Sequence, residues 1–250
     1  MDYKKINSKT IDRWVSEGWE WGKPISHEVY VDAVNGKWNL LLTPTKHVPK
    51  EWFPNLKDAK VLGLASGGGQ QMPIFAALGA CCTILDYSDS QLESEKMVSK
   101  REKYHINIIK ADMTQRLPFD DETFDLIFHP VSNCYVKEVK SIFLECYRLL
   151  KKGGILLSGL DNGINYLVNE DEKTIVNKMP FDPLSNEKLF EHCLENDYGI
   201  QFSHTLEEQI GGQIESGFVL THLYEDTNGS GYLHDLNITT FIATRSLKKI

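Results

Sequence analysis

Three consecutive glycines, Gly67 to Gly69, follow a short apolar run that ends at Leu64. A strand that leads into a glycine cluster and then into a helix leaves backbone N–H groups open to a ligand, because glycine carries no side chain. The same pattern also suits a tight turn that holds no ligand. The cluster alone therefore does not decide between a binding loop and a plain turn.

An acidic residue at the end of the second apolar run makes the binding loop the better interpretation. Asp86 follows Gly67 by about 20 residues, the separation at which a carboxylate can accept hydrogen bonds from both hydroxyls of an adenosine ribose. Asp86 could instead be a turn residue or a charge at a helix N-terminus. Together with the glycine cluster, it predicts a site for an adenosine-containing cofactor.

Two other cofactor chemistries find less support. The nicotinamide fingerprint GxGxxG fails in both registers, because its third glycine position would be Gln70 or Met72. A nicotinamide-dependent oxidoreductase is therefore disfavoured. No HExxH motif and no paired Cys/His spacing is present, so no metal site is predicted. The five cysteines, at positions 81, 82, 134, 146 and 193, are expected to be reduced thiols of the core.

Alternating strands and helices from about residue 60 onward must position these groups. We expect strands at 61–64, 82–85, 106–109, 124–128, 155–158, 218–220 and 240–243. The intervening helices are expected at 70–78, from 88 to 103 with a capping box of Ser88 and Gln91, and around 139–150 with Gly153 and Gly154 ending it. A further helix should begin with a capping box of Thr205 and Glu208 and carry Leu206, Ile210 and Ile214 on one apolar face.

Five segments of the chain resemble the class I S-adenosylmethionine-dependent methyltransferases, particularly those related to the ubiquinone and menaquinone biosynthesis methyltransferases. The segments lie between about residues 60 and 158, in the family's order and spacing: 61–69 (VLGLASGGG), 85–88 (LDYS), 111–113 (ADM), 117–125 (LPFDDETFD) and 149–156 (LLKKGGIL). The resemblance implies an α/β, Rossmann-like fold: a seven-stranded, mostly parallel sheet with helices on both faces, here with an N-terminal helical cap. It implies S-adenosyl-L-methionine as the cofactor.

The resemblance also implies roles for individual residues. Asp86 would hold the ribose hydroxyls, Asp112 would accept a hydrogen bond from the adenine amino group, and Met113 would pack on the base. Gly67 and Gly69 would pass beneath the methionine part of the cofactor. The remaining residues expected to contact the cofactor are Ala65, Ser66, Tyr87, Gln91 and His129.

The chain departs from the family at the first loop. Gly63 stands where the family usually carries an acidic residue, and Ala65 stands where it usually carries a glycine. That carboxylate normally helps to place the ammonium group of the cofactor. We expect the ammonium to be met instead by backbone carbonyls of the first loop or by the N-terminal segment.

All five tryptophans, at positions 14, 19, 21, 38 and 52, precede the first strand. They predict either a lid over the cofactor or a helical extension that simply packs on the sheet. We divide the chain into an N-terminal cap or lid, residues 1–58, and a methyltransferase domain, residues 59–250, with a possible insertion at 161–186. The residues expected on the substrate side are Trp21, His27, Asn133, Tyr135 and Tyr166, while Asp161 could also line it.

No residue pattern marks a catalytic base. His27, His129 and His222 are candidates, although each is individually more typical of a structural or merely polar histidine. Methyl transfer needs mainly proximity, alignment and a dry pocket, with a base only where the nucleophile must lose a proton.

Charge and composition bound the remaining possibilities. A net charge of -8 with scattered basic residues disfavours nucleic acid as the main ligand and suits a neutral or cationic small substrate. The polar start, without a signal-peptide pattern, and the lack of a membrane-length apolar run predict a cytoplasmic protein. We therefore expect a methyltransferase that acts on a small molecule. A non-catalytic protein that binds S-adenosylmethionine is the alternative suggested by Gly63.

Overall fold

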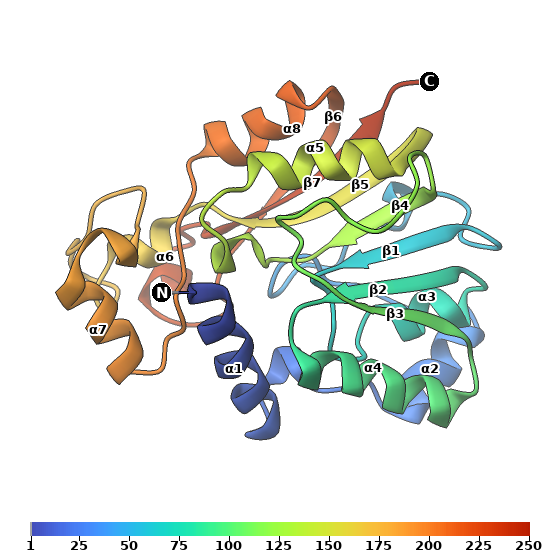
Figure 1. The fold of residues 1–250 in the computed structure, drawn as a ribbon, viewed down its shortest axis with the longest axis horizontal. Coiled ribbons are helices and arrows are strands. Elements are labelled where there is room, and N and C mark those ends of the chain that lie inside the picture. The colour runs from blue at the N-terminus through green and yellow to red at the C-terminus, as the bar shows by residue number, and fades with distance from the viewer. Residues whose placement is uncertain (1) are drawn as a thin grey trace.

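Seven strands form one sheet in the order β3-β2-β1-β4-β5-β7-β6 in the computed structural model, which describes residues 2–250 (Figure 1). β1 to β5 are parallel, and β7 runs antiparallel to both of its neighbours. The strands are β1 (Lys60–Leu64), β2 (Cys81–Asp86), β3 (Ile106–Lys110), β4 (Phe124–His129), β5 (Leu150–Asp161), β6 (Phe218–Asp226) and β7 (Phe241–Lys248). The predicted seven-stranded, mostly parallel sheet is confirmed.

Helices cover both faces of this sheet. The α-helices are α1 (Tyr3–Ser16), α2 (His27–Val34), α3 (Met72–Ala77), α4 (Asp89–Glu102), α5 (Lys140–Leu149), α6 (Ile164–Leu167), α7 (Glu187–Glu195), α8 (Gly212–Glu215) and α9 (Tyr232–Asp235). The 3-10 segments are η1 (Glu20–Gly22), η2 (Lys50–Trp52), η3 (Asn133–Tyr135) and η4 (Pro183–Ser185), and η5 (Glu207–Gly211) is π-helical.

Successive residues of each central strand pack on opposite faces. Val61 and Leu126 belong to the core that lies beneath α2, α3 and α4, whereas Leu62 and Ile127 belong to the core beneath α5. A parallel strand that is covered on both sides needs apolar side chains at every position, and this explains the unbroken apolar runs of the sequence. Figure 1 shows α5 and α8 on one side of the sheet and α2, α3 and α4 on the other.

Two local expectations are wrong. The helix before β5 ends at Leu149, and Gly153 and Gly154 lie inside β5, where Gly153 takes a φ of 77° next to a register shift in the β4–β5 pairing. The Thr205–Glu208 capping box forms, but the helix that follows exposes Leu206 and Ile214. The first turn of this helix is π-helical, so the residues that follow are rotated relative to an α-helix. Gln209 and Gln213 are therefore buried on the face where the 3.6-residue pattern predicts apolar side chains.

The tryptophan-rich N-terminal segment divides between two places. Trp52 is buried in the core on the α3 side and Trp38 packs against that core, whereas Trp14, Trp19 and Trp21 lie at the carboxyl ends of the strands. Met1, the first residue of the predicted segment 1–58, lies outside the described residues. Trp38 and Trp52 therefore pack with the sheet, whereas Trp14, Trp19 and Trp21 line the cavity.

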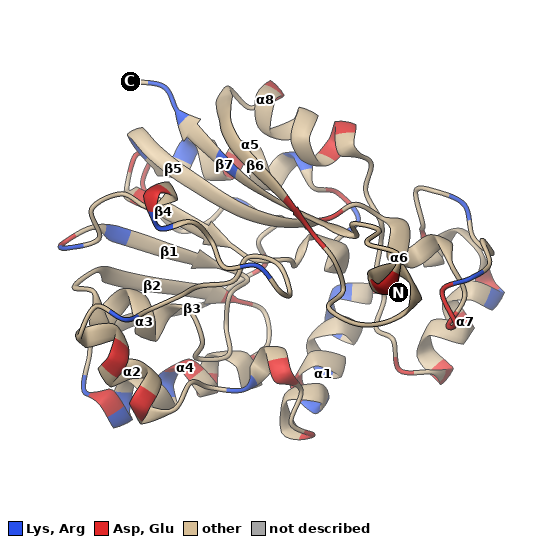
Figure 2. Cartoon of the chain, turned by 180° about the vertical axis from the view of Figure 1, so that it is seen from behind, with Lys and Arg blue, Asp and Glu red and all other residues tan. Residues whose placement is uncertain are grey.

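Other bulk features are simple. Within residues 2–250, no helix combines the length and the apolar character needed to cross a membrane. All five cysteines are free thiols, and four of them are buried as expected. The expectation of a core thiol is wrong for Cys81, which is exposed at the start of β2. Acidic and basic residues are interspersed over the helices and loops that Figure 2 shows.

Candidate functional site

A cavity of about 480 Å³ opens at the carboxyl ends of β1, β2, β4 and β5, beneath α1. Its volume is within the range of roughly 300–1,000 Å³ that small-molecule sites occupy. Ends of parallel strands at a reversal of strand order are where such folds bind ligands, because the loops on either side diverge there. The sheet reverses between β1 and β4, which the cavity spans.

The loop after β1 forms the floor of the cavity. Ala65 takes a left-handed φ of 47°, which a residue with a Cβ adopts at a cost of about 1–2 kcal/mol. A side chain on Gly67 would stand 2.6 Å from Gln91 Cβ and 2.9 Å from Asp86 Oδ2, so only glycine fits between the loop and α4. Ala65, Ser66 and Gly67 line the cavity, as predicted by their place in the loop.

The Asp86 carboxylate is fixed by three backbone N–H groups. Oδ2 accepts a 3.0 Å hydrogen bond from Gly67, and Oδ1 accepts bonds of 2.7 and 3.0 Å from Tyr87 and Ser88. Burial raises the pKa of Asp86 above its usual range, although these three N–H donors oppose the shift. Because Asp86 takes the Ser88 N–H, the predicted capping box forms only in half, with Ser88 Oγ accepting from Gln91 N.

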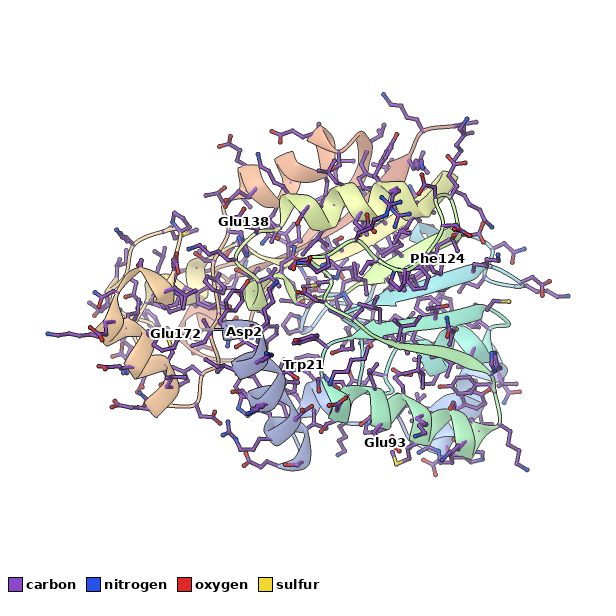
Figure 3. All side chains as sticks on the ribbon, viewed as in Figure 1. Asp2, Trp21, Glu93, Phe124, Glu138 and Glu172 are labelled. Atoms are coloured by element: carbon purple, nitrogen blue, oxygen red, sulfur yellow. The ribbon has the colours of Figure 1, made fainter. Side chains whose placement is uncertain are left out.

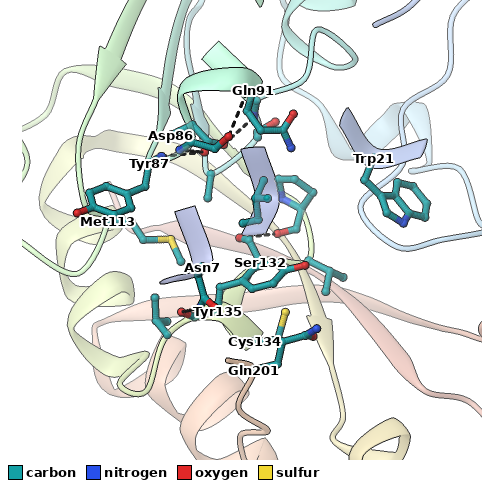
Figure 4. A pocket seen from close by; sticks show the side chains of 18 of the residues that line it. Asn7, Trp21, Asp86, Tyr87, Gln91, Met113, Ser132, Cys134, Tyr135 and Gln201 are labelled. Atoms are coloured by element: carbon teal, nitrogen blue, oxygen red, sulfur yellow. Dashed lines mark hydrogen bonds between the residues drawn. The ribbon is translucent and has the colours of Figure 1, made fainter. Parts of the chain in front are cut away.

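Gln91 consequently keeps an acceptor without a donor. Its Oε1 is buried in the cavity wall and has no hydrogen-bond partner among the described residues. Figure 4 shows the Asp86 side chain beside Gln91, and the bare backbone of Gly67 packs against both residues. This set of acceptors suits a ligand that brings several hydroxyl or ammonium donors, as the ribose and ammonium of S-adenosylmethionine would.

Asp112, just after β3, joins the N-terminal helix to this end of the sheet. Its Oδ2 accepts a 2.7 Å hydrogen bond from Lys4 of α1, and its Oδ1 accepts bonds from Thr114. Burial alone would raise the pKa of Asp112, but the Lys4 ammonium and the Thr114 donors outweigh it and hold that pKa below its usual value. Met113 is buried next to Asp112 and lines the cavity.

α1 forms a wall of the cavity and is anchored at both sides. Toward α4, Asp12 accepts from Ser88 Oγ at 2.6 Å and from Ser90 N at 2.9 Å. Toward the segment after α7, Asn7 donates to Ile200 O at 2.9 Å and accepts from Ile200 N at 2.7 Å. Figure 1 shows α1 between α4 and α7.

The segment after α1 crosses the glycine loop. Ile25 N donates to Gly69 O at 3.0 Å, and Gln70 Nε2 donates to Glu20 O at 2.6 Å. These contacts hold Trp21 at the mouth of the cavity, where Figure 3 places it between α1 and α4. Figure 4 shows the Trp21 ring across the cavity from Met113.

The opposite end of the cavity is aromatic and contains one acid. Tyr135 and Tyr166, both predicted on the substrate side, line it, and Tyr166 donates a 2.8 Å hydrogen bond to Gln201. Asp161, at the end of β5, lines it as well and is 3% exposed. Figure 4 shows Tyr135, Cys134 and Gln201 grouped at this end, away from Asp86.

Four of the predicted site residues do not line the cavity. His27 begins α2 and bonds the Glu102 carboxylate at 2.8 Å, with 69% of its side chain exposed, because α2 packs against the outer helices. Gly69 turns away from the cavity and donates to Glu95. His129 and Asn133 are buried behind the wall and bond one another at 2.8 Å.

His129 and Asn133 instead belong to a buried chain of hydrogen bonds. His129 Nδ1 bonds Leu64 O at 2.9 Å, Asn133 donates to Gln209 at 2.8 Å, and Gln209 donates to the backbone oxygen of Asp161 at 2.8 Å. Burial lowers the pKa of His129, so the ring is suited to bracing strand ends and not to holding a charge. The chain links the end of β1 to the end of β5.

Apolar side chains occupy the space beside Gly63, the position at which the family usually carries an acid. A Cβ on Gly63 would meet Met72 Cε and Sδ at 2.9 Å and Ile84 Cδ1 at 3.0 Å, and both of these side chains are fully buried. An acidic side chain at residue 63 would therefore need the packing between β1, β2 and α3 to change.

Sequence reasoning missed several residues of the cavity wall. The sequence shows no motif at these positions, apart from the clustering of tryptophans in the N-terminal segment. They include Lys4, Asn7, Ser8, Ile11, Trp14, Trp19, Gln70, Gln71, Cys134, Val136, Asn165, Gln201 and Phe241, with the segments 41–44 and 130–132.

Comparisons with known proteins agree with this geometry. A family described as a methyltransferase domain matches residues 62–158. An uncharacterized methyltransferase of Bacillus subtilis, YbaJ, is 42% identical over 97% of both chains. A demethylmenaquinone methyltransferase of Clavibacter sepedonicus is 32% identical over 38% of each chain. The structure of an S-adenosylmethionine-dependent methyltransferase from Mesorhizobium loti has a TM-score of 0.62 at 17% identity, covering 79% of this chain and 94% of that one.

Proposed function

We propose, from the premise that the chain belongs to the class I S-adenosylmethionine-dependent methyltransferases, that it methylates a small molecule bound in the cavity. The chain is an S-adenosylmethionine-dependent methyltransferase, and S-adenosylmethionine is its cofactor. Its similarity to a methyltransferase along nearly its whole length favours an enzyme over the non-catalytic and nicotinamide-dependent alternatives.

The cavity's acceptors support a cofactor orientation along the strand ends. In this proposal the ribose hydroxyls donate to Asp86 and to the unpartnered Gln91 Oε1, and the adenine lies beside Asp112 and Met113. Gly67 runs beneath the methionine part. The cofactor's sulfur end then faces β4 and β5, where Tyr135 and Tyr166 line the wall.

The chain's own contribution is positioning and exclusion of water. When bound, S-adenosylmethionine supplies an electrophilic methyl group on its sulfonium sulfur. Backbone donors fix Asp86, and the buried chain of hydrogen bonds from Leu64 to Asp161 fixes the strand ends on either side of the reacting region. Holding two substrates in the reactive alignment can lower the barrier of their reaction by roughly 7–11 kcal/mol.

One observation supports the proposal that the methyl acceptor is a small molecule: α1 and the segment after it enclose the cavity. Anchors at Asp12, Asn7 and Ile25 hold this wall from three sides. We propose that residues 2–25 are the lid and that the rest of the segment to residue 58 packs with the sheet, with 41–44 also lining the cavity. We propose further that 161–186 is an insertion that closes the substrate side. A nucleic acid has no role in this proposal, since the net charge is -8.

The test is the destination of the methyl group. The protein is incubated with S-adenosylmethionine carrying a labelled methyl group and with a cell extract, which is then divided into small-molecule, protein and RNA fractions. We expect the label in the small-molecule fraction. Label that enters only protein or RNA would contradict the proposal while leaving the cofactor assignment intact.

A further inference from the structure

One carboxyl group in the cavity wall keeps an oxygen without a donor. Asp161 Oδ1 accepts a 3.1 Å hydrogen bond from Gly163 N, whereas Oδ2 is buried and has no partner among the described residues. The residue is 3% exposed and lines the cavity. A buried acceptor without a donor costs free energy, so Oδ2 is suited to a donor that a ligand brings.

No basic side chain offsets this acid. Lys4 is the one lysine or arginine among the described residues that line the cavity, and its ammonium bonds Asp112 and Thr114. The other titratable groups that face Asp161 are Cys134 on η3 and Tyr166 on α6, and burial raises the pKa of both, so both are neutral at neutral pH. On β7 and η5, the residues that contact Asp161 are the uncharged Phe241 and Gln209.

Asp161 is also rigidly placed. β5 pairs it with Phe241 of β7, and Gln209 Nε2 donates to its backbone oxygen at 2.8 Å. Gln209 is itself held by Asn133, and Asn133 by His129. A carboxyl held by such a hydrogen-bond network keeps one position, whereas the side chain of a surface acid moves among several.

The surfaces around this acid are aromatic. Tyr135, Tyr166 and Phe241 line the cavity at this end, and Phe241 is the residue of β7 that pairs with Asp161. Aromatic faces attract cations within about 6 Å of the ring, and they exclude water that would weaken the attraction of a carboxylate. An unpaired acid among aromatic rings is the chemistry that recognises an organic ammonium group.

We propose that Asp161 Oδ2 binds the ammonium group of a small amine acceptor and takes one of its protons, so that the enzyme methylates nitrogen. This inference rests on the proposed small-molecule function. The ammonium donates a hydrogen bond to Oδ2 and then transfers that proton, which leaves a lone pair on nitrogen. The lone pair forms the new bond to the methyl carbon, and the electron pair of the broken sulfur–carbon bond stays on sulfur.

The protonation behaviour of Asp161 agrees with this role. Burial raises its pKa to about 7, although the Gly163 N–H opposes the shift. A carboxyl with a pKa near neutrality is matched to accept a proton at the pH at which the enzyme works. The ionised form binds an ammonium and the protonated form does not, so binding should weaken as the pH falls through about 7.

The test compares three probes of one shape and different charge: benzylamine, benzyl alcohol and benzoate. Each is titrated by calorimetry into the protein saturated with the demethylated product, S-adenosylhomocysteine. We expect benzylamine to bind at least about tenfold more tightly than benzyl alcohol, since a hydrogen bond between charged groups is roughly twice as strong as a neutral one, and benzoate to bind least. Asp161→Asn should remove at least about tenfold of the benzylamine affinity and change the alcohol little.

Two further readouts separate this role from a structural one. The benzylamine affinity of the parent protein should fall as the pH is lowered through about 7, while the amine itself stays protonated, and this dependence should vanish in Asp161→Asn. Asp235→Asn, at an exposed aspartate of α9, is the matched control.

Equal binding of the three probes by the parent protein would overturn the inference, even if Asp161→Asn did not fold. So would a pH-independent benzylamine affinity. Failure of S-adenosylhomocysteine to bind would instead count against the proposed function.

Discussion

Glu95 Oε1 accepts a 2.8 Å hydrogen bond from the Gly69 backbone N–H, beneath the glycine loop and out of contact with solvent. A carboxyl from α4 thus braces the loop from behind, in a chain where Gly63 replaces the acid that the family usually carries on β1. The second carboxyl oxygen, Oε2, has no hydrogen-bond partner among the described residues. Burial, aided by the nearby Asp86 carboxylate, raises the pKa of Glu95 to about 8, against the effect of the Gly69 N–H.

This carboxyl should make stability depend on pH. The unfolded state releases the Glu95 proton near 4.5 and the folded state near 8, so between these values the folded state binds more protons. The free energy of unfolding therefore falls as the pH rises from about 4.5 to about 8 and then levels off. Glu95→Gln keeps an acceptor for Gly69 and cannot ionise, so it should lose the part of the slope that Glu95 contributes, while Asp161, whose pKa burial raises to about 7, keeps its own part.

Chemical denaturation on either side of that pH window measures the effect. Glu95→Gln should match the parent in acid and exceed it in stability above about pH 8. Glu93→Gln, an exposed position of the same helix, is the control and should keep the slope. An unchanged slope in Glu95→Gln would show that Glu95 is already ionised in the folded protein.

The second prediction concerns Asp86, which we propose as the ribose anchor. Asp86→Asn replaces one carboxylate oxygen by an N–H donor, so a backbone N–H now bonded to that oxygen loses its partner and the ribose loses a charged acceptor. Loss of a hydrogen bond to a charged group costs about 1.5–3 kcal/mol, which corresponds to roughly tenfold to hundredfold weaker cofactor binding. Calorimetry with S-adenosylmethionine measures it.

The exposed Asp89 provides the control for this measurement. Asp89→Asn lies three residues away, outside the cavity wall, and should bind the cofactor as the parent does. A thermal melt of Asp86→Asn shows whether the variant is folded at the temperature of the titration. A folded Asp86→Asn with parental affinity would remove Asp86 from the cofactor site.

The third prediction is that Gly63 cannot be restored to the family's acid. Gly63→Asp places a Cβ within 3.0 Å of Met72 and Ile84 and a carboxyl among fully buried apolar side chains. Overpacking alone costs about 1–3 kcal/mol, and the buried charge adds to it. We expect a lower free energy of unfolding and no gain in affinity for S-adenosylmethionine.

Gly211→Ala serves as the reference glycine substitution. A Cβ there meets only Glu207 Cγ at 3.7 Å, an ordinary contact, so its stability should change little. Tighter cofactor binding by a stable Gly63→Asp would instead reveal space for an acid on β1, contrary to the packing.

The site residues that could be predicted from the sequence are those whose place along the chain, at the end of a strand, fixes where they lie in the fold. Asp86 ends a strand, and the glycine loop, Asp112 and Met113 each come after one. The parallel sheet brings the ends of its strands to one edge. Their convergence could therefore be predicted without knowing any tertiary contact. The prediction that Gly153 ends α5 is wrong for a local reason. A glycine soon after a helical pattern is typical of a helix end, and the sequence does not show that the next strand has already begun.

Residues whose partners are distant in sequence could not be predicted in this way. Asn7 pairs with Ile200, and Lys4 pairs with Asp112, although nothing near either residue marks the contact. His27 and His129 have the chemistry of site residues, but an outer helix carries the first and a buried hydrogen-bond chain holds the second. Residue type alone does not distinguish these environments.

The last prediction is that Asn7 latches the lid. Its amide makes three hydrogen bonds to backbone groups, donating to Tyr135 O and Ile200 O and accepting from Ile200 N, and its side chain is buried. Asn7→Ala leaves the Ile200 groups without partners. The other contacts of α1 are polar bonds through Lys4, Ser8 and Asp12 and a small apolar cluster, in which Tyr3 and Ile6 pack against Ile200 and Phe202.

Loss of the latch should free α1 without unfolding the sheet, since the cores on the two faces of the sheet contain no residue of α1. We expect amide hydrogen exchange to rise in residues 3–16 and to stay unchanged in β4, and the affinity for S-adenosylhomocysteine to fall about tenfold, in line with the loss of one or two buried hydrogen bonds. The ligand-induced change in tryptophan fluorescence should also shrink, because Trp14, Trp19 and Trp21 line the cavity. Asn35→Ala, at an exposed asparagine after α2 that bonds only its own helix, should change none of these. Faster exchange in α1 with unchanged affinity would mean that the helix packs beside the cavity without closing it, and the proposed lid would then have to begin after residue 16.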